Sequence, residues 1–330
     1  MTTTKSNPLG SGAPSAAFAR LRGIRDPDAP DGGGPPSRRR MKLRSVNRLT
    51  PWLYSAAALI LLITFTYIPV ANMIGYSFTD WDGLSRERDL VGLDNYVKVF
   101  TDPRYWQVFL VSMYYFVASF AQIAIALYFA TVLSFKTRFR NFFKGVLFFP
   151  YLLNGVAVGF VFLYLFQPGG TLDLVLGFFG VQDTPLWLGD PDIANFSLAS
   201  TSVWRFTGLT FVLFLGAIQS IPGELYEAAE IDGANRWQQF RFIIAPGIKR
   251  IISLSFILAI SGSLSVFEIP FVMTNGANGT STFVIQTVQT AFYFQRVGLA
   301  SAMAVVLLLI VLVITWIQRR MVPDEDVTLS

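Results

Sequence analysis

The sequence predicts an all-α membrane protein with six transmembrane helices. Of its 330 residues, 53% are hydrophobic and only 14% are charged, whereas soluble domains carry charge on roughly a quarter of their residues. Long apolar segments also recur along the chain, and about 20 helical residues are needed to cross the ~30 Å hydrocarbon core of a bilayer. Six segments meet this requirement: 52–76, 107–133, 146–167, 198–220, 250–272 and 299–317.

The two ends of the chain lie outside these segments. Residues 1–48 are rich in Gly, Pro, Ser and Asp and hold few large apolar side chains, which predicts a disordered cytoplasmic tail. The first apolar run is longer than the roughly 7–15 residues of a signal-peptide core, so it is expected to anchor the protein in the membrane. We therefore expect a six-helix domain at 49–320 and a short cytoplasmic tail at 321–330.

Positive charge predicts the orientation of the helices. Short cytoplasmic loops collect Lys and Arg, and twenty of the 26 such residues lie in 1–50, 134–145, 221–250 and 318–330. Five lie in the loops on the other side, and Arg205 lies within a predicted span. We expect a multi-pass protein of a prokaryotic cytoplasmic membrane with both termini in the cytoplasm.

The two longest outer loops are expected to differ in structure. In the loop 77–106, four apolar residues recur at the spacing of one helix face, which predicts a short amphipathic helix lying flat on the outer surface. The loop 168–197 holds several Pro and Gly and has no regular period, so irregular turns are expected there. The four residues of the predicted apolar face are Leu93, Tyr96, Val97 and Phe100.

Cysteine and histidine are both absent from the sequence. Their absence excludes disulfides, thiolate or imidazole metal sites, and catalysis by Cys, by Ser-His-Asp or by a His proton relay. The chain also lacks the GxxxxGK[ST] loop with which many ATPases hold phosphate. We predict that the protein is not an enzyme and that it carries no catalytic residue, metal site or cofactor of its own.

The most specific feature is a polar loop at 221–249, which we call the coupling loop. Pro222 suits the first turn of a helix and Gly233 suits a helix C-terminal cap, which predicts a short helix, a turn and a second helix. Four acidic residues precede the turn and four basic residues follow it. A solvated loop helix, whose charges only keep it in water, is the alternative interpretation.

Residue spacing in the coupling loop resembles the EAA signature of permease subunits in binding-protein-dependent ABC importers. Outside the motif, Trp204 and the run Gln219–Pro222 are similar to the carbohydrate branch of that family, the maltose and glycerol-phosphate permeases. The resemblance covers about residues 50–320, with Ala245 standing where the family usually has Leu. The matching motif residues, expected to couple the chain to an ATPase, are Glu227, Ala228, Ala229, Gly233, Ile243 and Pro246.

This resemblance implies a type I ABC importer permease fold and a set of partners. In the family, the EAA loop forms a coupling helix that docks in a cleft on a cytoplasmic ATPase. The Glu of the motif, here Glu227, contacts the ATPase, and the Gly, here Gly233, makes the turn. ATP and Mg²⁺ are bound by two partner ATPase subunits. A second permease subunit, giving a heterodimer, and an extracytoplasmic solute-binding protein are the other implied partners, with no nucleic acid involved.

Polar side chains within the spans mark faces that line a path, because such groups are costly in hydrocarbon. Arg205 and Glu268 are charged, so they are expected to pair with each other or to meet water. Close helix packing is the alternative for small residues, as for Gly155 and Gly159. The polar stripes are Ser112, Tyr115, Ser119 and Gln122 in the second span, Thr201, Arg205 and Gly208 in the fourth, and Ser261, Ser265 and Glu268 in the fifth.

The family resemblance selects a partly different face. In the maltose-type relatives, substrate is held near the midplane by positions that correspond to Ser202, Arg205 and Leu209, and by a face of the fifth span that includes Ser263 and Val266. Both faces are kept as candidates, together with two residues of the third span. The candidate substrate-path residues are Tyr115, Tyr151, Asn154, Ser202, Arg205, Leu209, Ser263, Ser265 and Glu268.

These patterns predict a permease subunit of an ATP-driven ABC importer that takes up a sugar or an oligosaccharide. Alternatives within the class are ABC permeases for glycerol phosphate, a polyamine or an amino acid, although one Arg offset by one Glu gives no net cationic site for a phosphate ester. An ion-coupled secondary transporter is disfavoured because Glu268 stands nearly alone among midplane acids. An integral membrane enzyme would need a catalytic constellation that a chain without His and Cys hardly provides.

Overall fold

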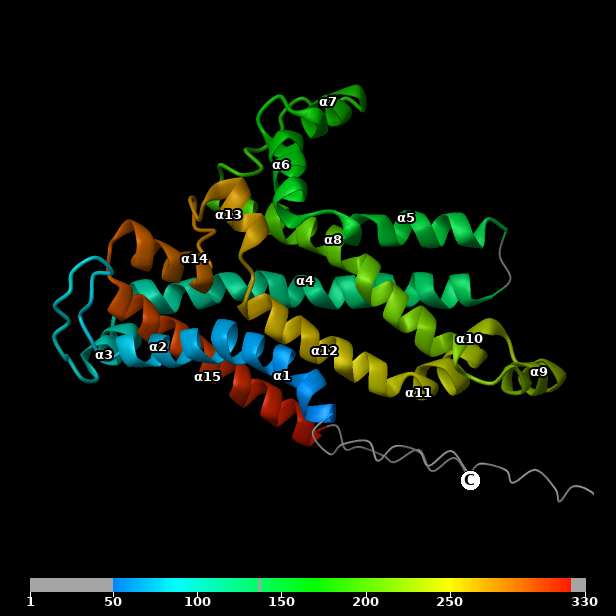
Figure 1. Cartoon of the computed structure of the whole chain (residues 1–330). Coiled ribbons are helices and arrows are strands. Elements are labelled where there is room, and N and C mark those ends of the chain that lie inside the picture. Colours follow the sequence, from blue (N-terminus) through cyan, green and yellow to red (C-terminus); the bar gives the residue numbers. More distant parts are fainter. Residues whose placement is uncertain (1–49, 136–137, 322–330) are drawn as a thin grey trace, which may run out of the picture. The chain divides into compact units, whose positions relative to one another are not determined.

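The computed structural model describes residues 50–135 and 138–321 (Figure 1). Contacts divide the chain into two units, residues 1–58 and 59–330, and the packing described below is that of the second. The described residues form helices joined by loops, with one isolated antiparallel bridge between Thr79 and Leu90.

Five helices among the described residues are long and apolar enough to cross a membrane, and a sixth span is added if one bent pair of helices is counted together. The predicted all-α, six-span fold is thereby confirmed. The predicted tail 1–48 and all of the predicted tail 321–330 except Met321, which ends α15, lie outside the described residues. The five are α1 (Thr50–Leu62) with η2 (Ile63–Tyr67) and α2 (Ile68–Tyr76), α4 (Pro103–Ser134), α8 (Pro191–Gln219), α12 (Lys249–Leu264) with α13 (Glu268–Thr274), and α15 (Val297–Met321).

The third predicted span, 146–167, is two helices rather than one. α5 (Arg140–Leu152) and α6 (Gly155–Phe166) are bent by 97° relative to each other. Pro150 has no N–H to donate within the last turn of α5. Three residues later, at Leu153, the backbone is extended, and Asn154 caps α6 by accepting a hydrogen bond from Val156 N at 2.9 Å. Pro, Asn and Gly therefore break a segment that hydropathy alone treats as continuous.

The loop predicted at 168–197 is more regular than expected. It contains α7 (Thr171–Phe178), and α8 already begins at Pro191. Asp190 caps α8 by accepting a hydrogen bond from Asp192 N at 2.9 Å, and Pro191 occupies the first helical position, where no N–H is needed. The first turns of α8 are polar, so a hydropathy criterion places the start of the span too late.

Packing of α4 against α8 forms the largest apolar core of the unit. Ala126 and Ala130 on α4 are fully buried beside Phe211 and Phe214 on α8, because small side chains on one helix admit large ones from the other. A polar contact crosses the same interface, where Gln122 Nε2 donates to Thr210 Oγ1 at 2.9 Å. This pair of long helices forms the scaffold on which the cavity described below is built.

The predicted amphipathic helix is α3 (Asp94–Thr101), but a different face of it is buried. Asn95 and Val99 are the buried residues, and Asn95 Nδ2 donates to the carbonyls of Ser77 and Thr79 at 3.0 and 2.7 Å. Three of the four residues predicted to form the apolar face, Leu93, Val97 and Phe100, are more than half exposed. The fourth, Tyr96, is half-buried and its Oη lies 2.6 Å from Ser77 Oγ.

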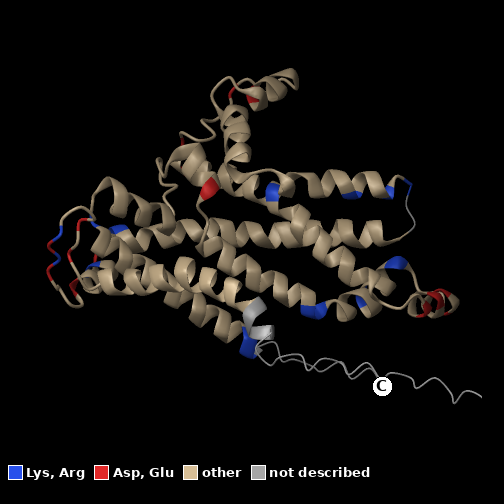
Figure 2. Ribbon diagram, viewed as in Figure 1, with Lys and Arg blue, Asp and Glu red and all other residues tan. Residues whose placement is uncertain are grey.

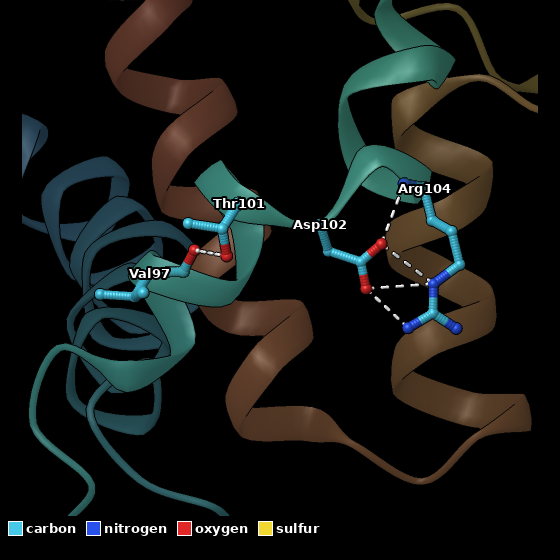
Figure 3. Close-up of polar contacts among 4 residues, drawn as sticks. All are labelled: Val97, Thr101, Asp102 and Arg104. Atoms are coloured by element: carbon cyan, nitrogen blue, oxygen red, sulfur yellow. Dashed lines mark hydrogen bonds and ion pairs between the residues drawn. The ribbon is translucent and has the colours of Figure 1, made fainter.

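The junction of α3 and α4 is held by one carboxylate (Figure 3). Asp102 accepts hydrogen bonds from Arg104 N at 3.0 Å and from the Arg104 guanidinium at 2.6 to 3.1 Å. The Arg104 side chain is the largest cause of a lowered pKa at Asp102, and the bond from its backbone N–H adds to it. This cap fixes where α4 begins, while Thr101 ends α3 by donating to Val97 O at 2.7 Å.

Candidate translocation cavity and coupling loop

A cavity of about 880 Å³ lies between α4, α5, α8, α12 and α13. Its wall is mostly apolar. Four of the five helices contribute uncharged polar side chains, and α8 and α13 contribute one cation and one anion, respectively. A concave, largely apolar site of this volume with a few convergent polar groups is typical of a small-molecule binding site.

Eight of the nine candidate substrate-path residues line this cavity. The ninth, Asn154, caps α6 instead. Ser119 and Gln122, two further members of the polar stripe on α4, also line it. The eight are Tyr115, Tyr151, Ser202, Arg205, Leu209, Ser263, Ser265 and Glu268.

The other stripe residues, Ser112, Thr201, Gly208 and Ser261, are not part of the cavity wall. Thr201 is buried and its Oγ1 donates to Ser197 O at 3.0 Å within its own helix. Gly208 lets α5 approach α8, since a Cβ at this position would lie 2.6 Å from Leu147 O. Helical spacing groups residues on one face but does not say which neighbour that face meets.

Arg205 and Glu268 form an ion pair at the cavity, as the sequence predicts. Arg205 Nη1 donates to Glu268 Oε2 at 2.8 Å. The Arg205 side chain is 13% exposed and the Glu268 side chain 54% exposed, so the carboxylate is the more open member of the pair. The guanidinium carbon of Arg205 also lies 5.1 Å from the ring centre of Phe206.

Gly155, the first residue of α6, packs directly against this ion pair. A Cβ at Gly155 would contact Glu268 Oε2 and would lie 2.9 Å from Arg205 Cζ. Gly159, one turn further, packs against Val272 of α13, with 2.8 Å between the same hypothetical Cβ and Val272 Cβ. The two glycines thus allow α6 to pack closely on α13, and the role of Gly155 beside the charges is one that the sequence analysis missed.

Three polar atoms of cavity-lining residues are buried without a hydrogen-bond partner among the described residues. They are Tyr115 Oη, Ser202 Oγ and Arg205 Nε. Buried hydroxyls and N–H groups in folded proteins are nearly always satisfied by protein, water or ligand. The three residues line the cavity, although the three atoms themselves are buried.

The fifth span is interrupted at the cavity wall. α12 ends at Leu264 and α13 begins at Glu268, leaving Ser265, Val266 and Phe267 outside both helices. Thr282 Oγ1 donates to Val266 O at 2.8 Å and so satisfies one carbonyl freed by the break. Phe267 stacks on Phe271, with 4.8 Å between ring centres. In membrane proteins, non-helical backbone within the hydrocarbon region is tolerated where it lines a cavity.

A row of small residues along α12 is a second feature, of which the sequence prediction named only Ser263. Ser255, Ala259, Gly262 and Ser263 all line the cavity. Their spacing of four, three and one residues places them on one face of a helix, so this signal was present in the sequence.

The coupling loop folds as predicted, into a helix, a turn and further helices. α9 (Gly223–Ile231) ends in a Schellman motif, in which Gly233 N donates to Glu230 O at 3.1 Å and Ala234 N donates to Ala229 O at 2.8 Å. Gly233 has φ +74°, a left-handed conformation that favours glycine. The chain continues through α10 (Arg236–Gln239), η3 (Phe240–Ile244) and α11 (Ala245–Gly247).

Most of the coupling loop surface is open. α9 buries none of its residues, and Glu227 and Ala228 are exposed. Large apolar side chains are exposed beside these polar residues, with Ile231 at 87% and Trp237 at 66%. Acidic residues gather on α9, and basic residues lie near its base (Figure 2). An apolar surface rimmed by charge is typical of a docking site for another protein.

The base of the coupling loop is fixed to the helical core. Ile244 and Ile248 are buried in the same apolar cluster as α4 and α8, and Tyr226 packs against that cluster. Burial raises the pKa of Tyr226. Of the remaining motif residues, Ala229 and Ile243 are half-buried, whereas Pro246 is exposed. The loop therefore combines an anchored base with an open tip.

Two helices connect the coupling loop to the cavity. α8 runs from cavity-lining Arg205 to Gln219, and α12 runs from Lys249 to cavity-lining Ser263. Each stretch rises about 21 Å at 1.5 Å per residue. Two continuous helices thus join the coupling loop to two walls of the cavity.

A family model described as binding-protein-dependent transport system inner membrane component matches residues 122–326. The chain belongs to this family of permeases. The matched range contains the coupling loop and the cavity-lining helices α5, α8, α12 and α13. Family membership and the long apolar helices together show that this permease is a multi-pass membrane protein.

Individual relatives match nearly the whole permease. YurN of Bacillus subtilis (strain 168), a probable ABC transporter permease protein, is 34% identical over 83% of this chain and 96% of its own. AmyD of Thermoanaerobacterium thermosulfurigenes, a probable starch degradation products transport system permease protein, is 31% identical over 85% of this chain and 96% of its own.

A solved structure shares the permease fold. A chain from the crystal structure of a bacterial alginate ABC transporter, in complex with an alginate pentasaccharide-bound periplasmic protein, aligns with a TM-score of 0.72 at 20% identity. The alignment covers 82% of this chain and 93% of the other. The agreement extends over the helical unit and supports the arrangement of α4, α8 and α12 around the cavity.

Proposed function

We propose that this permease forms, with a second permease subunit, the translocation path of an ATP-driven importer for a sugar or an oligosaccharide. The observation that carries the proposal is the cavity, whose wall combines polar side chains with apolar surface. Sugars present hydroxyls that both donate and accept hydrogen bonds, together with apolar ring faces, so they match both parts of such a wall.

The names of the relatives support a carbohydrate as the solute. AmyD is named for the transport of starch degradation products, and the aligned solved structure holds an alginate pentasaccharide on its periplasmic protein. The alginate transporter's solute is acidic, whereas the cavity here carries one cation and one anion. An uncharged sugar therefore suits this chain better than an acidic one.

Energy for transport comes, in this proposal, from two partner ATPase subunits that bind ATP and Mg²⁺ and dock on the coupling loop. The exposed apolar and acidic surface of α9 supports such docking. Both termini and the coupling loop face the cytoplasm, and a solute-binding protein delivers the sugar on the opposite side. ATP binding then favours one arrangement of the two permeases over another, and α8 and α12 carry the change to the cavity.

The proposal is tested by affinity purification of the tagged permease in mild detergent, followed by mass spectrometry and reconstitution. We expect recovery of an ATPase, a second permease and a binding protein, and ATP-dependent uptake into liposomes of the sugar that the binding protein retains. A permease recovered without an ATPase, or uptake that continues without ATP, would overturn the proposal and favour an ion-coupled carrier.

A further inference from the structure

The cavity wall carries no net charge from this chain. Among its described lining residues, the ionisable groups are Arg205, Glu268 and two tyrosines. Tyrosines are uncharged at neutral pH. The positive charge of Arg205 is thus balanced within the cavity by Glu268 alone.

The neighbourhood of Glu268 would favour an anion if its carboxylate were removed. Arg205 donates to Glu268 Oε2 at 2.8 Å, and Gly155 at the N-terminus of the twelve-residue helix α6 packs against the same oxygen. Helix N-termini carry partial positive charge and bind carboxylates and phosphates, as arginine does. Glu268 therefore occupies a position that is suited to an anionic group of a ligand.

The rest of the polar wall suits an uncharged ligand. Its polar residues other than the ion pair are uncharged and include Ser119, Gln122 and Ser202. A hydroxyl donates one hydrogen bond and accepts others, so it pairs with sugar hydroxyls in either direction. The Glu268 carboxylate is 54% exposed, which leaves it accessible as an acceptor for the same ligand.

We propose that Glu268 determines the charge selectivity of the cavity: as a tethered anion it neutralises Arg205 and the start of α6, so that uncharged sugars are accepted and sugar acids are rejected. The proposal rests on the proposed function, because it concerns the solute of the same cavity. Removal of the Glu268 charge converts this region into a binding site for a carboxylate.

The test compares two probes, maltotriose and trigalacturonate, by equilibrium binding to the complete transporter in lipid nanodiscs without nucleotide or binding protein. Glu268→Gln preserves the size of the side chain and removes its charge. We expect the variant to bind trigalacturonate at least about tenfold more tightly than the wild type does. Maltotriose binding is expected to weaken or to stay unchanged.

Controls separate selectivity from structural damage. Glu87→Gln removes a charge from an exposed loop between α2 and α3 and is expected to leave both affinities unchanged. Arg205→Gln combined with Glu268→Gln restores a neutral wall and is expected to abolish the gain for trigalacturonate. Glu268→Asp keeps the charge and is expected to reject the acid, as the wild type does.

A Glu268→Gln transporter that assembles normally but gains no affinity for trigalacturonate would overturn the charge-selectivity proposal. That result leaves the proposed function standing if ATP-dependent sugar uptake is retained. Conversely, a gain in trigalacturonate affinity in a transporter that shows no ATP-dependent uptake would support the charge-selectivity proposal and count against the proposed function.

Discussion

The carboxylate of Glu268 occupies the space that a side chain on Gly155 would need. A Cβ at Gly155 would contact Glu268 Oε2, and Arg205 Cζ lies 2.9 Å from the same point. Gly155 begins α6, Glu268 begins α13, and Arg205 lies within α8. The start of two helices and one side chain of a third therefore meet at a single position on the cavity wall.

Gly155→Ala is expected to displace Glu268 and to break its ion pair with Arg205. Overpacking of a closely packed position costs about 1–3 kcal/mol, so we expect a lower thermal unfolding temperature for the purified permease. The loss is expected to shrink when Glu268→Ala is introduced as well, because the smaller side chain removes the contact with Glu268 and leaves only those with Arg205. Thermal unfolding of the single and double variants measures this coupling.

Gly216→Ala provides the control for this substitution. Gly216 lies in α8, and a Cβ there would meet nothing within 4 Å. The substitution is expected to be neutral or to stabilise the helix by up to about 1 kcal/mol. An equal loss for Gly155→Ala with and without Glu268 would show that the contact with Glu268 is not the cause.

Features set by local chemistry or by charge could be predicted from the sequence. The coupling loop is one, because Pro222 fixes its own φ and Gly233 can adopt the left-handed conformation that ends a helix, whatever the surrounding structure is. The pairing of Arg205 with Glu268 is another, because two opposite charges in apolar spans have few alternatives to each other. Both predictions are confirmed by the structure.

Other features that depend on contacts between distant segments could not be predicted. The sequence places Gly155 and Gly159 one turn apart but does not show that Glu268 lies beside the first of them. The polar stripe through Gly208 has the spacing of a path-lining face, yet that face packs against α5. The bend after Leu152 was missed because hydropathy sums over Pro150 and Asn154 without using their effect on the backbone.

Glu227→Lys is expected to uncouple the permease from the ATPase of the proposed function while leaving it in the membrane. Glu227 is exposed on α9, which buries none of its residues, so reversal of its charge disturbs docking more than folding. Copurification of the ATPase and ATP-dependent uptake are both expected to fall at least about tenfold. Glu87→Lys, in the exposed loop between α2 and α3, is the matched control. Unchanged ATPase recovery with Glu227→Lys would contradict the docking role.

Gly233→Ala is expected to destabilise the turn of the coupling loop. Gly233 has φ +74° and nothing within 4 Å of a Cβ position, so the cost is one of backbone conformation and not of space. The left-handed conformation costs a non-glycine residue about 1–2 kcal/mol. Transport coupling should therefore decrease more for Gly233→Ala than for Gly233→Asn, since Asn tolerates this conformation better.

Gly223→Ala is the control for the turn substitutions. Gly223 is the first residue of α9 and has open space around its Cβ position. Its replacement is expected to leave ATP-dependent uptake unchanged. If Ala and Asn at position 233 reduced coupling equally, a property of glycine other than its left-handed backbone would be responsible.

The cap of α4 is expected to make stability depend on acidity. The Arg104 side chain, followed by its backbone N–H, lowers the pKa of Asp102 below its ordinary value of 3.8. A carboxyl group whose pKa is lower in the folded than in the unfolded state stabilises the fold above the unfolded pKa. This contribution is lost as the pH falls through the folded pKa. The stabilisation by Asp102 is thus present at neutral pH and disappears below about pH 4.

Asp102→Asn tests this dependence because Asn retains a cap but not the charge. We expect the wild type to unfold at a higher temperature than the variant at pH 7, and the difference to vanish on acidification. Arg104→Gln removes the main cause of the lowered pKa of Asp102. In this variant, the stabilisation of the fold by Asp102 should therefore be lost at a higher pH than in the wild type. A difference between wild type and Asp102→Asn that stays constant from pH 7 to acidic pH would assign the effect to shape rather than to charge. Asp102 loses its charge on acidification, whereas Asn has none to lose.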